Sequence, residues 1–95
     1  MFYVYIITNK PLGTIYLGQT DDLVKRMWQH KNKVRSGFAS RYNLDKLVWF
    51  EVFDTREAAF TIERRMKTWK RQWKINKIEE TNADWNDLTN SLSSF

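Results

Sequence analysis

Residues 3–20 read YVYIITNKPLGTIYLGQT, and this stretch decides the fold. Two runs rich in β-branched and aromatic residues, each typical of a β-strand, flank the polar segment NKPLG. That segment holds the only proline of the chain, followed two residues later by a glycine, which favours a turn. The stretch therefore predicts a β-hairpin with a five-residue loop.

The alternation of side chains along the two strands defines a candidate site. Tyr3, Tyr5 and Ile7 are expected on one face of the first strand, and Tyr16 and Gly18 on one face of the second. A tyrosine in a strand is ordinarily explained by its high β-propensity. Gly18 needs another explanation, because a glycine weakens a strand and often marks a close approach to the backbone. The hairpin is expected to bring Tyr5 and Tyr16 close together, since opposed side chains lie about 5 Å apart.

The middle of the chain predicts a helix, a loop and a buried strand. Residues 21–34 carry an apolar stripe at helical spacing behind a capping aspartate, Asp21 or Asp22. The stripe consists of Leu23, Met27, His30 and Val34. Residues 36–43 break this pattern and predict a loop, and residues 46–53, KLVWFEVF, predict a buried strand.

The last part of the chain predicts two helices. A long helix is expected to begin after the cap Thr55 and to continue without a break to Ile78. Its inward stripe is Ala59, Ile62, Met66, Trp69 and Trp73. A short terminal helix is expected within residues 81–92, with Asn82 as its cap and with Trp85 and Leu88 packing back on the core. The fold class is therefore α+β, one domain over residues 1–95, with a three-stranded antiparallel or mixed sheet flanked by helices in the order β-β-α-β-α-α.

Composition narrows the classes of function. The chain has no cysteine, which excludes disulfides and thiolate metal sites and fits a cytoplasmic location. No apolar run approaches the roughly 18 residues of a membrane span, so no membrane partner is expected. The net charge is +5, and residues 54–78 alone carry eight Lys or Arg against three acids. A basic helix over residues 56–77 suits a nucleic acid, although basic faces also serve solubility.

Two helical residue pairs are candidates for chemistry. Arg26 and His30 are four residues apart, so both can face one site, although the spacing alone favours His30 as a structural residue at the edge of the core. Glu63 lies on the flank of the inward stripe with Lys67, Lys70 and Lys74. Glu63 either forms an ordinary ion pair with Lys67 or binds Mg²⁺. One carboxylate can suffice for Mg²⁺, because this ion often keeps most of its waters.

Together these residues resemble the GIY-YIG nuclease family, and specifically its small single-domain bacterial branch (UPF0213-like). The first motif reads Tyr3-Val4-Tyr5 here and the second Tyr16-Leu17-Gly18. Further matching positions follow in order at Thr20, Leu23, Arg26, His30 and Glu63. The glycine of the first motif is replaced by Tyr3 and the isoleucine of the second by Leu17, and neither change removes a side chain expected to do chemistry.

The resemblance implies a metal-dependent DNA endonuclease, with a structure-selective role in repair or recombination as one setting. Glu63 would hold Mg²⁺ or Mn²⁺, and Arg26 would neutralise charge on the phosphate. Tyr5 is the candidate base, assisted by Tyr16 and His30, with a pKa lowered by the nearby metal, Arg26 and the basic helix. Gly18 would leave room for the phosphate. The residues expected to bind the DNA backbone are Lys67, Lys70, Arg71 and Lys74.

Two other readings remain open from the sequence. One is a non-catalytic nucleic-acid-binding module that uses the basic helix over residues 56–77. The other is an interaction protein whose tryptophans contact a partner, although Trp69 and Trp73 have a simpler role in the core. The partners expected are DNA and a targeting protein. The sequence defines neither the preferred DNA structure nor the oligomeric state.

Overall fold

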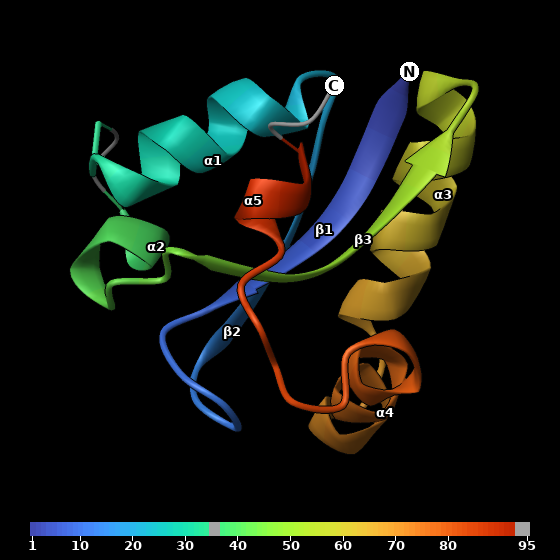
Figure 1. Cartoon of the computed structure of the whole chain (residues 1–95). Coiled ribbons are helices and arrows are strands. Elements are labelled where there is room, and N and C mark those ends of the chain that lie inside the picture. Colours follow the sequence, from blue (N-terminus) through green and yellow to red (C-terminus); the bar gives the residue numbers. More distant parts are fainter. Residues whose placement is uncertain (35–36, 93–95) are drawn as a thin grey trace.

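A computed structural model describes residues 1–34 and 37–92 (Figure 1). Within these residues, three strands form one antiparallel sheet in the order β2-β1-β3. The strands are β1 (Phe2–Thr8), β2 (Ile15–Thr20) and β3 (Lys46–Phe53). The hairpin and the third strand are confirmed, and β1, which carries the candidate Tyr5, is the central strand.

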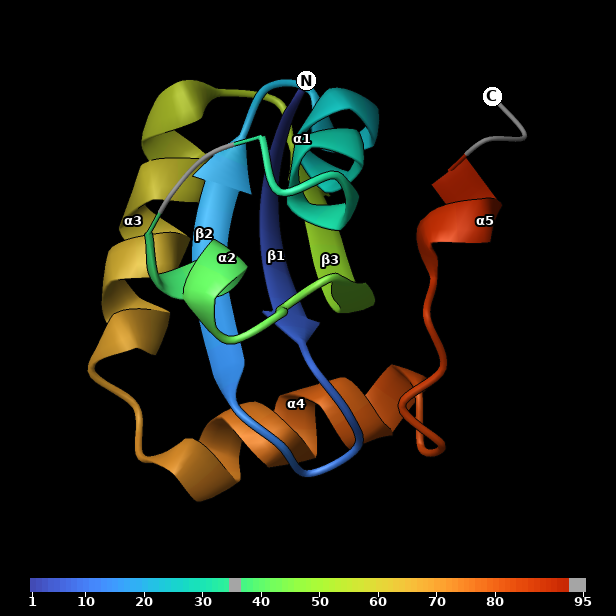
Figure 2. The same ribbon diagram turned by 90° about the vertical axis from the view of Figure 1, so that its left-hand side faces the viewer.

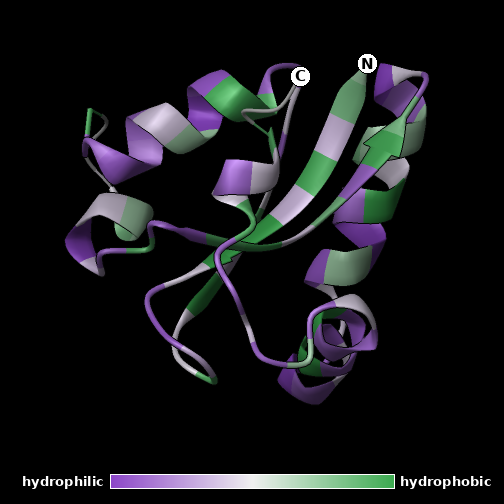
Figure 3. Cartoon of the chain, in the orientation of Figure 1, coloured by the Kyte–Doolittle hydropathy of each residue, from purple (hydrophilic) through white to green (hydrophobic). Residues whose placement is uncertain are grey.

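The helices cover the two faces of the sheet. One face is covered by α1 (Leu23–Lys31), α2 (Phe38–Arg41) and α5 (Thr89–Leu92), and the other by α3 (Arg56–Lys67) (Figures 1 and 2). The helix α4 (Arg71–Thr81) crosses the end of the sheet and adds to the core on the α3 side. Figure 3 shows apolar residues along β1 and β3 and hydrophilic residues on much of the helices. None of the helices within residues 1–34 and 37–92 is both long enough and apolar enough to cross a membrane.

The strand alternation divides the interior into two clusters. Val4, Ile6 and Leu17 pack with residues of α3 and α4 on one face. Tyr5 and Ile7 pack with residues of α1 and α5 on the other, and Tyr3 and Tyr16 lie at the edge of that cluster. The predicted sharing of faces along the hairpin is therefore confirmed.

The expected long helix is wrong, because the chain turns between Lys67 and Arg71. The Thr68 hydroxyl donates to the Arg65 carbonyl at 2.7 Å, and Lys70 has an extended backbone with ψ of 150°. The cause is tertiary, since the turn lays α4 across the end of the sheet (Figure 2), where Ile75 and Ile78 join the core. Trp73, predicted to face inward along a straight helix, is 55% exposed.

The first helix and the following loop also differ from expectation. Asp22 caps α1 by accepting from the backbone N–H of Lys25 at 3.0 Å. However, α1 ends at Lys31, so Val34 falls outside the helix and is 55% exposed. Residues 38–41 form the short helix α2 instead of a loop. Gly37 precedes it with φ of +130°, a conformation that favours glycine.

Residues 82–88, between α4 and α5, run along β3 and do not form the start of a helix. We call this segment the strap. Asn82 ends α4, and its side-chain amide donates to the carbonyls of Val48 at 3.1 Å and Asn86 at 2.8 Å. Trp85 follows in a left-handed conformation with φ of +58°, which does not continue a helix. Trp85 is buried and Leu88 is partly buried, so the expectation that both pack back on the core is confirmed.

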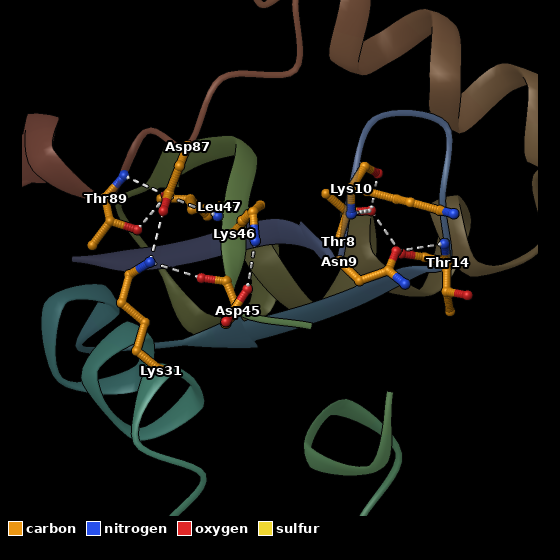
Figure 4. Close-up of polar contacts among 10 residues, drawn as sticks. All are labelled: Thr8, Asn9, Lys10, Thr14, Lys31, Asp45, Lys46, Leu47, Asp87 and Thr89. Carbon is orange, nitrogen blue, oxygen red and sulfur yellow. Dashed lines mark hydrogen bonds and ion pairs between the residues drawn. The ribbon is translucent and has the colours of Figure 1, made fainter. Parts of the chain in front are cut away.

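Asp87 joins the strap to both β3 and α1 (Figure 4). Its carboxylate accepts from the backbone N–H of Leu47 at 3.1 Å and from the Lys31 ammonium at 2.6 Å. Burial acts to raise the pKa of Asp87, but the bonds from Lys31, Thr89 and Leu47 outweigh burial and hold it below its usual 3.8. The carboxylate therefore stabilises the fold in its charged form.

Candidate active site

A pocket of about 200 Å³ opens between the hairpin, α1 and α2. Four of the predicted site residues line it together: Tyr5, Tyr16, Arg26 and His30. Each comes from a regular element, because β1 and β2 carry the tyrosines and α1 carries Arg26 and His30 one turn apart. The hairpin and the helical spacing thus bring these four side chains to one site.

The tyrosine of β1 is joined to the histidine of α1. The Tyr5 hydroxyl lies 3.2 Å from His30 Nε2, and the two ring centroids are 5.9 Å apart. Tyr5 is only 1% exposed, whereas His30 is half-buried and borders the pocket. A histidine in this position both orients the phenol and offers a place for its proton.

The pKa of Tyr5 moves in the direction opposite to the one expected from the sequence. Burial raises it above the usual 10.0, and the nearby Arg26 guanidinium lowers it without offsetting the burial. The Tyr16 and Glu63 side chains raise it further. In the protein without bound metal or DNA the pKa is therefore raised, whereas the lowering expected from the sequence included the charge of the metal. Tyr5 is a neutral phenol in the site at neutral pH.

Gly18 makes room for the two tyrosine rings. The strand register pairs Tyr5 with Gly18 and Ile7 with Tyr16, so the tyrosines are diagonal neighbours and not directly opposed. A Cβ at position 18 would lie 2.8 Å from the Tyr5 hydroxyl oxygen and 3.0 Å from Cε2 of Tyr16. The missing side chain at position 18 therefore accommodates the rings of Tyr5 and Tyr16. The glycine is required by the site's own side chains.

Glu63 approaches the site from the opposite layer. It lies on α3, is 9% exposed, and its Oε2 is 3.4 Å from Lys67 Nζ. Glu63 does not line the pocket, but its negative charge raises the pKa of Tyr5. Among residues 1–34 and 37–92, no three His, Cys, Asp or Glu side chains gather as a metal site. The chemistry of the single buried carboxylate nevertheless fits Mg²⁺, which binds hard oxygen ligands and retains several waters.

Comparison with known proteins identifies the family of this chain. The family model described as the GIY-YIG catalytic domain matches residues 1–76. The chain belongs to the GIY-YIG family of nucleases.

The similar curated proteins come from bacteria and an archaeon. The UPF0213 protein of Staphylococcus saprophyticus is 35% identical over 78 residues, covering 82% of this chain and 94% of that protein. The UPF0213 protein of Bacillus pumilus is also 35% identical, covering 82% and 79%. That of Haloquadratum walsbyi is 33% identical, covering 82% and 86%. No solved structure matches the chain.

Two of the basic residues predicted to bind DNA at this GIY-YIG site have partners within the protein. Lys67 is paired with Glu63, and Arg71 Nη2 donates to the carbonyls of Leu12 at 2.9 Å and Gly13 at 2.6 Å. Lys70 is exposed and Lys74 half-buried. Because the chain turns between α3 and α4, the four residues do not form a single track along one helix.

The sequence reading missed part of the GIY-YIG pocket. Gln29 and Lys33 line it from α1 and the residues that follow, and Phe38 lines it from α2. Gln29 directly precedes His30 and Lys33 lies one helical turn beyond it, so helical spacing offered a signal for them. Phe38 offered none, because residues 36–43 carry no periodic pattern.

Proposed function

We propose that this GIY-YIG protein is a metal-dependent endonuclease that hydrolyses phosphodiester bonds in DNA. The observation that carries the proposal is the contact of 3.2 Å between the Tyr5 hydroxyl and His30 Nε2, in a pocket shared with Tyr16 and Arg26. Membership of the GIY-YIG family supports a nuclease activity. The net charge of +5 supports a polyanionic substrate.

Arg26 is the residue that neutralises the phosphate. A phosphodiester resists attack because its oxygens are negatively charged, and this charge grows as a nucleophile approaches. The guanidinium presents a planar set of donors that matches phosphate oxygens. Arg26 lines the pocket and acts on Tyr5, so a phosphate bound to Arg26 lies beside the phenol.

The protonated state of Tyr5 defines a proton path through His30. Because burial raises the pKa of Tyr5, a free phenolate is scarce at neutral pH. The phenol oxygen instead accepts the proton of the attacking water while its own proton passes to His30 Nε2. This relay needs a neutral imidazole whose Nε2 can accept the proton.

Glu63 is the residue that would hold Mg²⁺ or Mn²⁺. The bound cation would supply Lewis-acid stabilisation of the negative charge on the phosphate and on the leaving oxygen. The buried position of Glu63 on α3 restrains its carboxylate, and the ion pair with Lys67 at 3.4 Å restrains it further.

The biological setting belongs to the same proposal. We assign the enzyme a structure-selective role in DNA repair or recombination, with a targeting protein as its partner. A cytoplasmic location suits a chain without cysteine.

The test is cleavage of labelled single-stranded, duplex, flapped and branched DNA with Mg²⁺, with Mn²⁺ and with chelator. Glu63→Gln keeps the size of the side chain and removes its charge, so cleavage is expected to fall at least about 100-fold. Glu57→Gln is the matched control, because Glu57 is an exposed glutamate in the first turn of the same helix. It is expected to leave the rate unchanged.

Two outcomes would contradict the proposal. Cleavage that is equal in Glu63→Gln and wild type would remove the metal role of Glu63. Equal binding of DNA by both proteins, with no cleavage of any substrate under any metal, would instead favour the non-catalytic binding module.

A further inference from the structure

Three aromatic rings form a row that leads out of the pocket. The centroids of the Tyr16 and Phe38 rings are 6.4 Å apart, and those of Phe38 and Tyr42 are 4.7 Å apart. Tyr16 borders the pocket beside Tyr5, whereas Phe38 is 49% and Tyr42 44% exposed. The row therefore begins at the candidate reactive residues and ends in solvent.

The outer two rings of this row are not needed to fill the core. None of the four described residues of α2 is buried. Phe38 contacts both Tyr16 and Tyr42, and Phe38 and Tyr42 leave large parts of their side chains exposed to water. Exposed aromatic rings held side by side are a surface on which another flat ring can stack.

The charge around the row favours an anionic ligand. Residues 23–44 contain six Lys or Arg and no Asp or Glu. Lys33 lines the pocket together with Phe38, and Arg41 lines an open hollow beside Phe38 and Ser40. A ligand that is both aromatic and negatively charged matches this surface, and a nucleotide has both properties.

We propose that Phe38 and Tyr42 form a stacking subsite for an unpaired DNA base next to the phosphate that is cut. This inference rests on the proposed nuclease function and names its substrate class, DNA with unpaired bases at the cut. In a duplex the flat faces of the bases are covered by their neighbours, so they become available to protein rings only in single strands, flaps or bulges. Every base has such a face, and the subsite therefore selects DNA structure and not sequence.

Binding separates this inference from the cleavage chemistry. Fluorescence anisotropy with labelled single-stranded DNA and its duplex form is measured in chelator, where no metal-dependent cleavage occurs. Phe38→Leu and Tyr42→Leu keep apolar bulk and remove the aromatic face. Each is expected to weaken single-strand binding about 5- to 50-fold and duplex binding less than about twofold.

The matched control is Phe60→Leu, because Phe60 is 40% exposed on α3 and does not line the pocket. It is expected to change neither affinity. Thermal unfolding of each variant verifies that the fold is kept, as expected for positions that are largely exposed. Phe38→Trp, which restores an aromatic face, is expected to recover single-strand binding.

A base-deletion series tests stacking itself. An abasic site is moved along the single strand, and the position where it weakens wild-type binding most marks the stacked base. With that base missing, Phe38→Leu is expected to cause no further loss, because both changes remove the same contact. A fluorescent 2-aminopurine at the same position is expected to be quenched by wild type and not by Phe38→Leu.

The outcomes distinguish the two proposals. If Phe38→Leu weakens single-strand and duplex binding equally, or weakens neither, the stacking subsite is overturned whether or not the protein cuts DNA. If Phe38→Leu selectively weakens single-strand binding while no DNA is cut with any metal, the subsite stands and the nuclease function fails.

Discussion

The two faces of the sheet are built from alternate residues of the same strand and differ in what they do. On one face Val4 and Ile6 pack with apolar side chains of α3 and α4. On the other face Tyr5 reaches a pocket bordered by Arg26 and His30. A one-residue step along β1 therefore separates side chains of the α3 and α4 core from the side chain that borders the pocket.

The difference lies in how completely each face is covered. Two helices of 12 and 11 residues close the first face. The second face is covered by α1 and by two helices of four residues each, which leave the pocket open. The pocket gives solvent and substrate access to the site, while both faces bury apolar side chains that stabilise the fold.

The largest expected effect is on the cleavage rate of Tyr5→Phe, which removes one hydroxyl from the face of the sheet that borders the pocket. Without that oxygen the water proton cannot reach His30, and cleavage is expected to fall about 10²- to 10⁴-fold. The free energy of unfolding should change by no more than about 1 kcal/mol, because the ring is kept. Single-turnover cleavage and urea unfolding measure the two quantities.

Tyr3→Phe is the control for that change, since Tyr3 shares the face and the strand with Tyr5 but does not line the pocket. Its cleavage rate is expected to equal that of wild type. A Tyr5→Phe protein that cuts DNA at the wild-type rate would contradict the role of the phenol.

The next largest effect is expected from Ile6→Ala on the opposite face. Ile6 is 1% exposed, and truncating a buried isoleucine costs about 2 to 5 kcal/mol of stability. Urea unfolding measures this loss, and the folded fraction is expected to keep a wild-type cleavage rate. Val52→Ala is the control, because Val52 is 44% exposed on β3 and should cost less than about 1 kcal/mol. An equal loss in both variants would argue against the described core.

Gly18→Ala is expected to lower both stability and activity, because the added methyl would crowd the rings of Tyr5 and Tyr16. The added methyl would lie 2.8 to 3.0 Å from atoms of Tyr5 and Tyr16, so both rings must shift. Such overpacking costs about 1 to 3 kcal/mol, and displacement of Tyr5 should lower the cleavage rate. Gln19→Ala at the neighbouring position should change neither quantity much. Wild-type stability and activity in Gly18→Ala would refute the close contact.

The smallest effect is expected at the strap, which lies outside the comparison of the two faces. Asp87→Asn weakens the charged bonds to Lys31 and Leu47 and should cost about 1 kcal/mol at neutral pH, since the carboxylate is partly exposed. Because the pKa of Asp87 is lowered in the folded state, its contribution is complete well above pH 3.8 and is lost as the pH falls below that value. Thermal unfolding between pH 3 and 7 is expected to show the difference from wild type shrinking in acid.

Asp84→Asn provides the control for this pH dependence, because Asp84 is exposed in the same segment. It should follow wild type at every pH. A constant difference between Asp87→Asn and wild type down to pH 3 would exclude the titration of Asp87 as its source.

Local patterns predicted the hairpin, the third strand and four of the pocket residues. Tyr5, Tyr16, Arg26 and His30 could be placed because strand alternation and helical spacing are local rules. Their meeting in one pocket follows once the hairpin lies against α1.

The failures occurred where packing overrides local preference. Nothing in residues 68–70 forbids a helix by composition, and the turn there is fixed by the docking of α4 across the sheet. The pKa of Tyr5 was predicted from nearby charge alone, but burial, which a sequence does not state, has the larger effect. Arg71 was predicted to bind DNA, but in the fold its guanidinium donates to the carbonyls of Leu12 and Gly13 in the hairpin loop.

The strap also has a consequence for how copies of the chain behave at high concentration. A strand at the border of a sheet normally presents backbone groups to which a strand of another molecule can add, and this is a common start of aggregation. Here β3 is such a border strand, but the N–H and C=O of Leu47 are bonded to Asp87 and Leu88, and the C=O of Val48 is bonded to Asn82. Further along, the exposed charge of Glu51 discourages pairing. The irregular segment after α4 thus protects the β3 border of the sheet against strand addition without extending the sheet.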